Sequence, residues 1–138
     1  MGNKNRLRVL LADDHTAMLE EVGRQLRPDY EVVGTVEDGG ALVEAAKSLH
    51  PDLIISDISM PVMTGFEAAA KIRASGLNPK LIFLTVQSSA PYLKKAYALG
   101  ANGYVLKAFA NEQLLTAIST VAKGGKFLSP QLQSEFWK

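Results

Sequence analysis

The chain has 138 residues, of which 47% are hydrophobic and 21% are charged, and its formal net charge is +1 at pH 7. This size suits one globular domain with a full core, and the balanced charge lacks the dense basic footprint of a free-standing nucleic-acid-binding protein. The absence of cysteine excludes disulfides, thiolate catalysis and cysteine-bound zinc. No apolar run approaches the ~20 residues of a membrane helix, and no segment fits a secretory signal. We therefore expect a cytoplasmic protein with no membrane partner.

Short apolar blocks alternate with amphipathic stretches along the chain. The blocks are rich in Val, Ile and Leu and are bounded by turn-forming residues, which is typical of buried strands. The expected strands are residues 7–12, 31–36, 52–56, 81–86 and 103–107. Between them, apolar residues recur at spacings of three and four, which places them on one face of a helix. The helical stripes run over residues 18–26, 42–49, 66–70, 93–99 and 114–122.

The ends of these stripes carry helix stop signals. Pro28 follows the first stripe and Gly100 follows the fourth, and Asn111 is the expected cap of the last helix. Five repeats of strand and helix predict an α/β fold, in which a doubly wound parallel sheet is covered on both faces.

Polar residues stand at the carboxyl ends of the expected strands, which is where ligands bind in an open parallel sheet. Asp13 and Asp14 follow the first strand, and Asp57 follows the third. Thr85 lies at the end of the fourth strand and Lys107 at the end of the fifth. If the strand order is 2-1-3-4-5, these side chains meet in one crevice.

The chemistry of that crevice favours a divalent cation and a phosphoryl group. Three neighbouring carboxylates repel one another unless a cation is present, and their oxygens suit Mg²⁺. A lysine and a threonine supply the point charge and the donor that a phosphoryl group requires. An aspartate carboxylate can itself accept the phosphoryl group.

Four motifs surround these residues: ADDH at 12–15, DISMPVMTG at 57–65, LT at 84–85 and GYVLK at 103–107. On these motifs the chain resembles the receiver domain of two-component response regulators, over residues 6–124. The resemblance implies a flavodoxin-like (βα)5 fold with strand order 2-1-3-4-5. It also implies a regulatory phosphoacceptor rather than an enzyme, whose chemistry is limited to its own phosphorylation and dephosphorylation.

The resemblance further implies a role for each acidic residue. Asp57 would accept a phosphoryl group from the phosphohistidine of a sensor histidine kinase or phosphotransfer protein. Asp13 and Asp14 would hold Mg²⁺ or Mn²⁺, and Asp57 and the backbone carbonyl of Ser59 would complete its protein ligands.

The same resemblance assigns the remaining side chains. Lys107 would pair with the phosphoryl group, and Thr85 would donate a hydrogen bond to it. Tyr104 would be the switch aromatic, which turns inward when Thr85 moves and alters the surface around the fourth helix, fifth strand and fifth helix. For Tyr104, an ordinary core position is the alternative to this switch role. For His15, a solvated residue that opens the first helix is preferred over a ligand.

Two residues depart from the family pattern. Ala108 follows the lysine where many receivers carry a proline, although one subgroup lacks it too. Val86 follows Thr85 where most receivers carry a small residue, and it is expected to crowd the mouth of the site. A degenerate receiver that serves only for dimerisation is therefore an open alternative.

The end of the sequence indicates a subgroup. ADDH, a lysine without a following proline, and GGKFLSPQL at 124–132 are similar to regulators whose receiver precedes a LuxR/NarL-type helix-turn-helix domain. We expect a flexible end at 1–5, a receiver at 6–124, and an extension or linker at 125–138 toward an output domain that this chain lacks. The resemblance implies control of transcription, DNA contact through that output domain alone, and a homodimer on phosphorylation.

Two functions of other classes compete with this interpretation. A magnesium-dependent phosphohydrolase of the haloacid-dehalogenase type needs a second aspartate two residues after its nucleophile, and the chain has Ser59 there. A flavin-binding electron carrier needs a phosphate loop rich in Ser, Thr and Gly after the first strand, and the chain has Asp-Asp-His-Thr.

Overall fold

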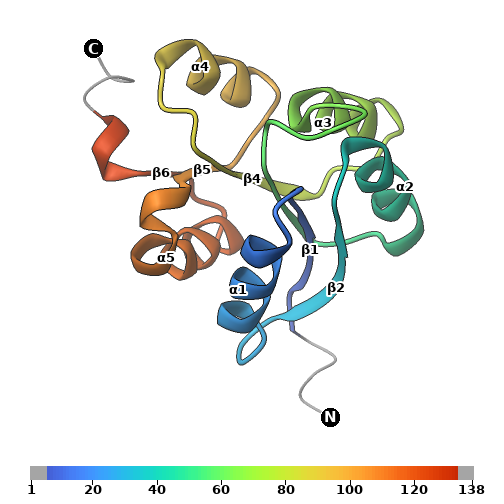
Figure 1. Ribbon diagram of the computed structural model, residues 1–138, viewed down its shortest axis with the longest axis horizontal. Helices are drawn as coiled ribbons and strands as arrows, with labels where there is room; N and C mark the ends of the chain where they lie inside the picture. The colour runs from blue at the N-terminus through green and yellow to red at the C-terminus, as the bar shows by residue number, and fades with distance from the viewer. Residues whose placement is uncertain (1–5, 134–138) are drawn as a thin grey trace.

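The apolar blocks of the sequence form one parallel sheet in the computed structural model, which describes residues 6–133 (Figure 1). Within that range the strand order is β2-β1-β3-β4-β5-β6, so the predicted order 2-1-3-4-5 is confirmed. The strands are β1 (Arg8–Ala12), β2 (Glu31–Val36), β3 (Leu53–Ser56), β4 (Lys80–Thr85), β5 (Gly103–Leu106) and β6 (Phe127–Leu128).

Helices cover both faces of the sheet. They are α1 (Thr16–Leu26), α2 (Gly39–Leu49), α3 (Gly65–Ala74), α4 (Ala90–Ala98) and α5 (Ala110–Ala122). α1 and α5 pack on one face, and α2, α3 and α4 on the other (Figure 1). The short 3-10 helices η2 (Lys107–Phe109) and η3 (Pro130–Leu132) follow β5 and β6. No helix in the described part of the chain is long and apolar enough to cross a bilayer.

The central strands are buried on both sides, which explains why their sequences are almost continuously apolar. Along β3, Ile54 points to the α2–α4 side while Ile55 points to the α1–α5 side. Both have at most 2% of their surface exposed. β2 lies at the sheet edge with β1 as its neighbour, and its residues are half-buried or exposed. A strand is present at 31–36 as expected, but the expectation that it is buried is wrong.

The beginning of α5 differs from the sequence prediction. η2 runs directly into the helix, so α5 begins at Ala110 with Phe109 at its cap position. Asn111 is an exposed residue of the first turn, and its expected role as the helix cap is wrong.

The segment after α5 adds a strand that the sequence analysis did not anticipate. β6 pairs in parallel with β5, and Leu128 lies opposite Tyr104. The stretch expected as an extension thus continues the sheet as far as residue 128 and packs on it as far as Leu132, which is buried. The expected flexible end at 1–5 and the last part of the extension, 134–138, lie outside the described residues.

Candidate functional site

The carboxyl ends of the central strands lie at one edge of the sheet and carry the predicted site residues. Ala12 pairs with Ser56, so Asp13 and Asp57, which follow them, lie side by side. The Asp57 N–H donates to the Ala12 carbonyl at 2.9 Å, and this bond holds the carboxyl ends of β1 and β3 together. Thr85 ends the neighbouring strand β4. All three polar residues are buried, with at most 4% of their surface exposed.

Four side chains form an acidic cluster at this edge: Asp13, Asp14, His15 and Asp57. Each offers one ligand atom, and these atoms all lie within 4.8 Å of one another. The Asp14 side chain is 35% exposed, whereas those of Asp13 and Asp57 are only 5% and 6% exposed. The cluster therefore has two buried carboxylates and one that faces solvent at its mouth.

Lys107 lies against the two buried carboxylates. Its Nζ is 2.8 Å from Asp13 Oδ2 and 3.0 Å from Asp57 Oδ2. Burial alone would lower the pKa of Lys107, but the hydrogen bonds to Asp13 and Asp57 outweigh burial, and the pKa is raised. The ammonium thus stays charged at neutral pH. One ammonium against three carboxylates leaves excess negative charge, which suits a divalent cation with hard oxygen ligands.

The loop between β3 and α3 is shaped around the Asp57 backbone. The Gly65 N–H donates to the Ile58 carbonyl at 2.7 Å, which brings the loop back onto its own beginning. A Cβ atom at Gly65 would lie 2.1 Å from the Asp57 carbonyl oxygen, so this position requires glycine. The Ile58 N–H also donates to Asp57 Oδ1 at 2.7 Å and orients the carboxylate. Ser59 is an exposed residue of this loop, and the role of its carbonyl as a metal ligand stays a prediction.

Thr85 and Tyr104 are linked through the backbone of Gln87. Thr85 Oγ1 accepts a hydrogen bond from the Gln87 N–H at 3.1 Å, and the Tyr104 hydroxyl donates to the Gln87 carbonyl at 2.7 Å. Tyr104 lies inward and is fully buried, and burial raises the pKa of its phenol. The switch roles of Thr85 and Tyr104 stay predictions, but the two side chains share one backbone segment. This link could not be predicted from the sequence, because no residue pattern marks a contact made by backbone atoms.

Two further residues border the site. Val86 is 70% exposed, so its side chain does not enter the core. His15 is the N-cap residue of α1 and its side chain is 70% exposed, in line with the solvated helix opener expected from the sequence. Its Nδ1 nevertheless lies 3.1 Å from Asp13 Oδ1 and 3.3 Å from Asp14 Oδ1. This contact was not predicted from the sequence.

With this geometry established, comparison with known proteins decides the family. The family described as "Response regulator receiver domain" matches residues 9–119, which is most of the chain. This chain belongs to the response regulator receiver family. The resemblance inferred from the four motifs is thereby confirmed, and membership sets aside the phosphohydrolase and the flavin carrier. Receivers are regulatory domains rather than conventional enzymes.

Individual relatives agree with the family match. The receiver is 36% identical over 134 residues to the nitrate/nitrite response regulator protein NarL of Escherichia coli K12, covering 96% of this chain and 62% of NarL. A LuxR-family two-component response regulator from Aurantimonas sp. SI85-9A1 superposes with a TM-score of 0.90 at 29% identity, covering 96% of both chains. The isolated receiver of RcsB from Salmonella enterica serovar Typhimurium, solved with the phosphomimetic BeF3⁻, gives a TM-score of 0.88 at 28% identity, covering 96% of this chain and 99% of that one.

The curated relatives are longer than this receiver. The chain spans 56% to 65% of the length of the curated relatives that it matches. The fold and the family follow from the matched part, whereas the activities of the complete relatives come to this chain as proposals only.

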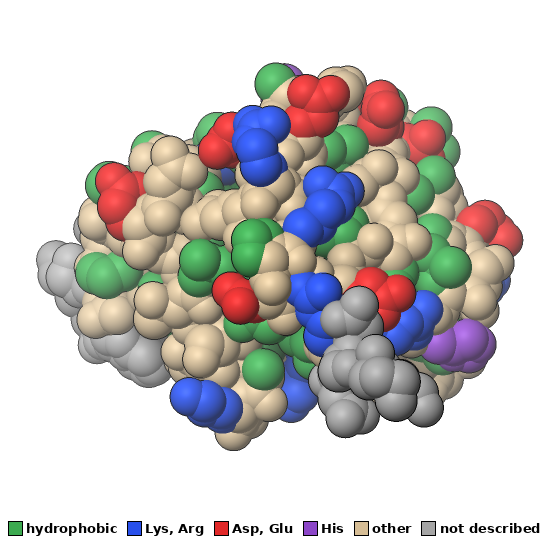
Figure 2. Space-filling model, turned by 90° about the horizontal axis from the view of Figure 1, so that it is seen from below, with side chains coloured by type: hydrophobic (Ala, Val, Ile, Leu, Met, Phe, Trp, Pro, Cys, Tyr) green, Lys and Arg blue, Asp and Glu red, His purple; other side chains and the backbone are tan. Residues whose placement is uncertain are grey.

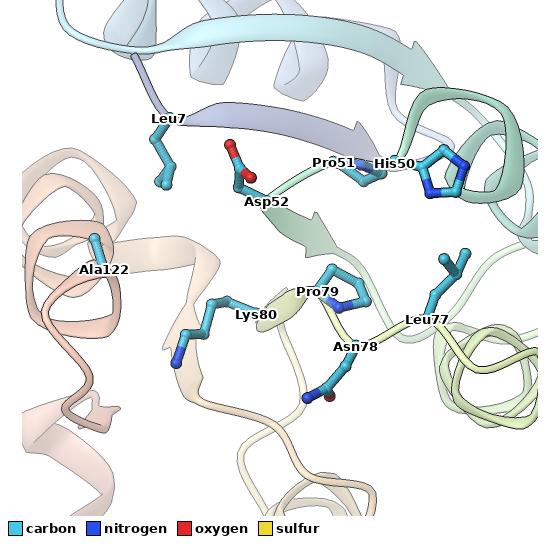
Figure 3. Close-up of a pocket in the computed structure, with 9 residues that line it drawn as sticks. All are labelled: Leu7, His50, Pro51, Asp52, Leu77, Asn78, Pro79, Lys80 and Ala122. Atoms are coloured by element: carbon cyan, nitrogen blue, oxygen red, sulfur yellow. The ribbon is translucent and has the colours of Figure 1, made fainter. Parts of the chain in front are cut away.

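A separate pocket lies at the amino ends of the strands, on the opposite side of the molecule from the acidic cluster (Figure 3). Its volume is about 400 Å³, and it is lined near the amino ends of β1, β3 and β4 by Leu7, Asp52 and Lys80. Asp52 accepts a hydrogen bond from the Arg8 N–H, so its carboxylate is already engaged there. On the face seen in Figure 2, basic and acidic side chains are interspersed and do not form a large patch of one charge. The acidic cluster is therefore the better candidate for the chemistry of this receiver.

Proposed function

We propose that this receiver is a phosphorylation switch in which Asp57 is the phosphoacceptor. A sensor histidine kinase or phosphotransfer protein would supply the phosphohistidine. An Asp57 oxygen would form a bond to phosphorus, the phosphorus–nitrogen bond to histidine would break, and its electron pair would stay on the imidazole. The observation that carries this proposal is the Lys107 ammonium 3.0 Å from Asp57 Oδ2, beside an acidic cluster with excess negative charge.

The residues present fit a Mg²⁺ or Mn²⁺ ion. Asp13, Asp14 and Asp57 would hold it, together with the carbonyl of Ser59, because hard oxygen ligands of this kind suit these ions. When bound, the ion would neutralise charge shared by the carboxylates and the incoming phosphoryl group. Asp14 faces solvent and so has the access that a hydrated ion needs.

Lys107 is suited to follow the charge as it moves. Once Asp57 is phosphorylated, the negative charge lies on the phosphoryl oxygens instead of the carboxylate. Asp13, 2.8 Å from the same Nζ, would keep the ammonium in the site while it pairs with those oxygens.

Thr85 and Tyr104 would report the phosphoryl group to the surface. Donation from the Thr85 hydroxyl to a phosphoryl oxygen would draw in the segment that holds Gln87. Because Tyr104 is bonded to the Gln87 carbonyl, the movement would reach α4, β5 and α5.

We further propose that the switch controls transcription through a helix-turn-helix output domain and a homodimer. NarL is described as a response regulator, the Aurantimonas protein belongs to the LuxR family, and RcsB has been solved as dimers bound to DNA. DNA contact would belong to the output domain, since the receiver itself has a net charge of only +1.

Mass spectrometry after treatment with Mg²⁺ and a small phosphodonor such as acetyl phosphate tests the proposal. The wild-type chain should gain one phosphoryl group and Asp57→Asn should gain none. Asp29→Asn, at an exposed position outside the cluster, is the matched control and should be labelled like the wild type. Equal labelling of Asp57→Asn would remove Asp57 from its role.

A further inference from the structure

The segment of residues 126–132, which we call the C-terminal clamp, is fastened to the strand that carries the switch residues. It lies beyond the residues matched by the receiver family. The Phe127 N–H donates to the Asn102 carbonyl and the Ser129 N–H donates to the Tyr104 carbonyl, both at 3.0 Å. Figure 1 shows the clamp at the edge of the sheet, beside β5 and between α4 and α5. The clamp is thus attached to the backbone of Tyr104 itself.

Ser129 is the most buried residue of the clamp, with 0% of its surface exposed. Its Oγ accepts a hydrogen bond from the Leu106 N–H at 3.0 Å and donates one to Gln113 Oε1 at 2.6 Å. Together with its own N–H on Tyr104, this serine holds β5 at two points and α5 at a third. A small hydroxyl residue therefore ties the end of β5 to the helix that follows it.

The residue after Leu106 is Lys107, whose ammonium lies on Asp57 and Asp13. By holding the Leu106 N–H, Ser129 therefore fixes the position of the backbone from which the Lys107 side chain extends. In the structure the bonded clamp occurs together with Tyr104 in its inward position and with Lys107 directed at Asp57. This is the arrangement that a phosphoryl group on Asp57 would require of Lys107.

We propose that Ser129 is a positioning residue for the phosphoryl site, and that the bonded clamp and a phosphoryl group on Asp57 stabilise each other. The inference rests on the proposed function of Asp57. Removal of the hydroxyl would leave the Leu106 N–H and the Gln113 oxygen without this partner in a half-buried place, which favours release of the clamp. Coupling between two sites is reciprocal. If a phosphoryl group on Asp57 raises the equilibrium constant for clamp binding by some factor, release of the clamp must lower the affinity for the phosphoryl group by the same factor.

Beryllofluoride binding in the presence of Mg²⁺, followed by NMR titration, measures this coupling in the full chain. Ser129→Ala should bind beryllofluoride at least about fivefold more weakly than the wild type, the low end for coupled sites. Ser129→Thr keeps the hydroxyl and should recover most of the affinity. Gln133→Ala is the matched control, since the Gln133 side chain donates to the Leu128 carbonyl at 3.1 Å and not to a backbone group of β5. It should bind like the wild type.

Amide hydrogen exchange in the wild type gives the reciprocal measurement and needs no variant to fold. Beryllofluoride should slow exchange at the Leu106 and Ser129 amides. Unchanged exchange there, or a Ser129→Ala chain that is less stable in urea yet binds beryllofluoride like the wild type, would reduce Ser129 to a structural residue and overturn the inference. A wild-type chain that neither binds beryllofluoride nor accepts a phosphoryl group would instead overturn the proposed function.

Discussion

Val62 holds a backbone conformation that its side chain disfavours, and Val62→Gly should therefore stabilise the fold. Its φ is +72°, and it stands at the centre of a tight turn in which the Met63 N–H donates to the Pro61 carbonyl at 2.7 Å. A positive φ is uncommon for any residue with a Cβ and is a true outlier for a β-branched one. The side chain is 82% exposed, so burial does little to offset the strain.

The expected gain follows from two opposing terms. Relief of a left-handed conformation contributes about 1–2 kcal/mol, because glycine has no Cβ to clash with the following carbonyl. The larger freedom of glycine in the unfolded chain offsets about 0.5–1 kcal/mol of this. At the midpoints of these two ranges the free energy of unfolding should rise by about 0.8 kcal/mol, which raises Tm by roughly 2–4 °C for a domain of this size.

Urea unfolding at equilibrium, with a thermal scan beside it, measures this difference. Val62→Ala is the control, since it removes the two methyl groups but keeps the Cβ that causes the strain. It should show little or no gain. If Val62→Gly is no more stable than the wild type, or if Val62→Ala gains as much, the stability of the loop is not limited by backbone strain at this residue.

Three further outcomes test the site. Asp14→Ala should abolish Mg²⁺ binding and phosphodonor labelling, because a strongly hydrated ion loses one of few charged ligands; unchanged Mg²⁺ affinity in calorimetry would contradict this role. Phosphorylation should shift the amide resonances of Thr85 and Tyr104 together, and unmoved resonances from 85 to 107 would rule out the switch. Val86→Ala should speed both phosphorylation and dephosphorylation several-fold in stopped-flow and decay measurements, since a barrier lower by 1.36 kcal/mol is tenfold in rate. Identical rates would mean that Val86 leaves the mouth of the site open.

The central strands could be predicted from the sequence because burial on both faces leaves little room for polar residues. Strands such as β3, with 2% exposure or less at Leu53, Ile54 and Ile55, stand out as apolar blocks. The same rule fails at the edges. β2 has the composition of a strand but is only half-buried, and β6 is two residues long and offers a single buried leucine as a signal.

The charged side chains of the site were also predictable, since Asp13, Asp57 and Lys107 occur at strand ends whose position in a parallel sheet is fixed by topology. Contacts that depend on tertiary placement were not. Nothing in the local sequence distinguishes Ser129 from an exposed loop serine, and the Tyr104 bond to the Gln87 carbonyl involves a backbone atom that every residue possesses.

β5 connects the acidic cluster to the clamp, because it is held on both of its edges and at its carboxyl end. Its neighbour β4 ends in Thr85 on one edge, and Ser129 binds the other edge at Tyr104 and Leu106. Past its last residue, Lys107 joins the strand to Asp13 and Asp57. A displacement of Lys107 must then change either the conformation of η2 or the hydrogen bonds of Ser129, because the strand between them is closely packed and cannot deform easily. The proposed signal, which begins at the carboxylates, would therefore reach the clamp through Lys107 and β5.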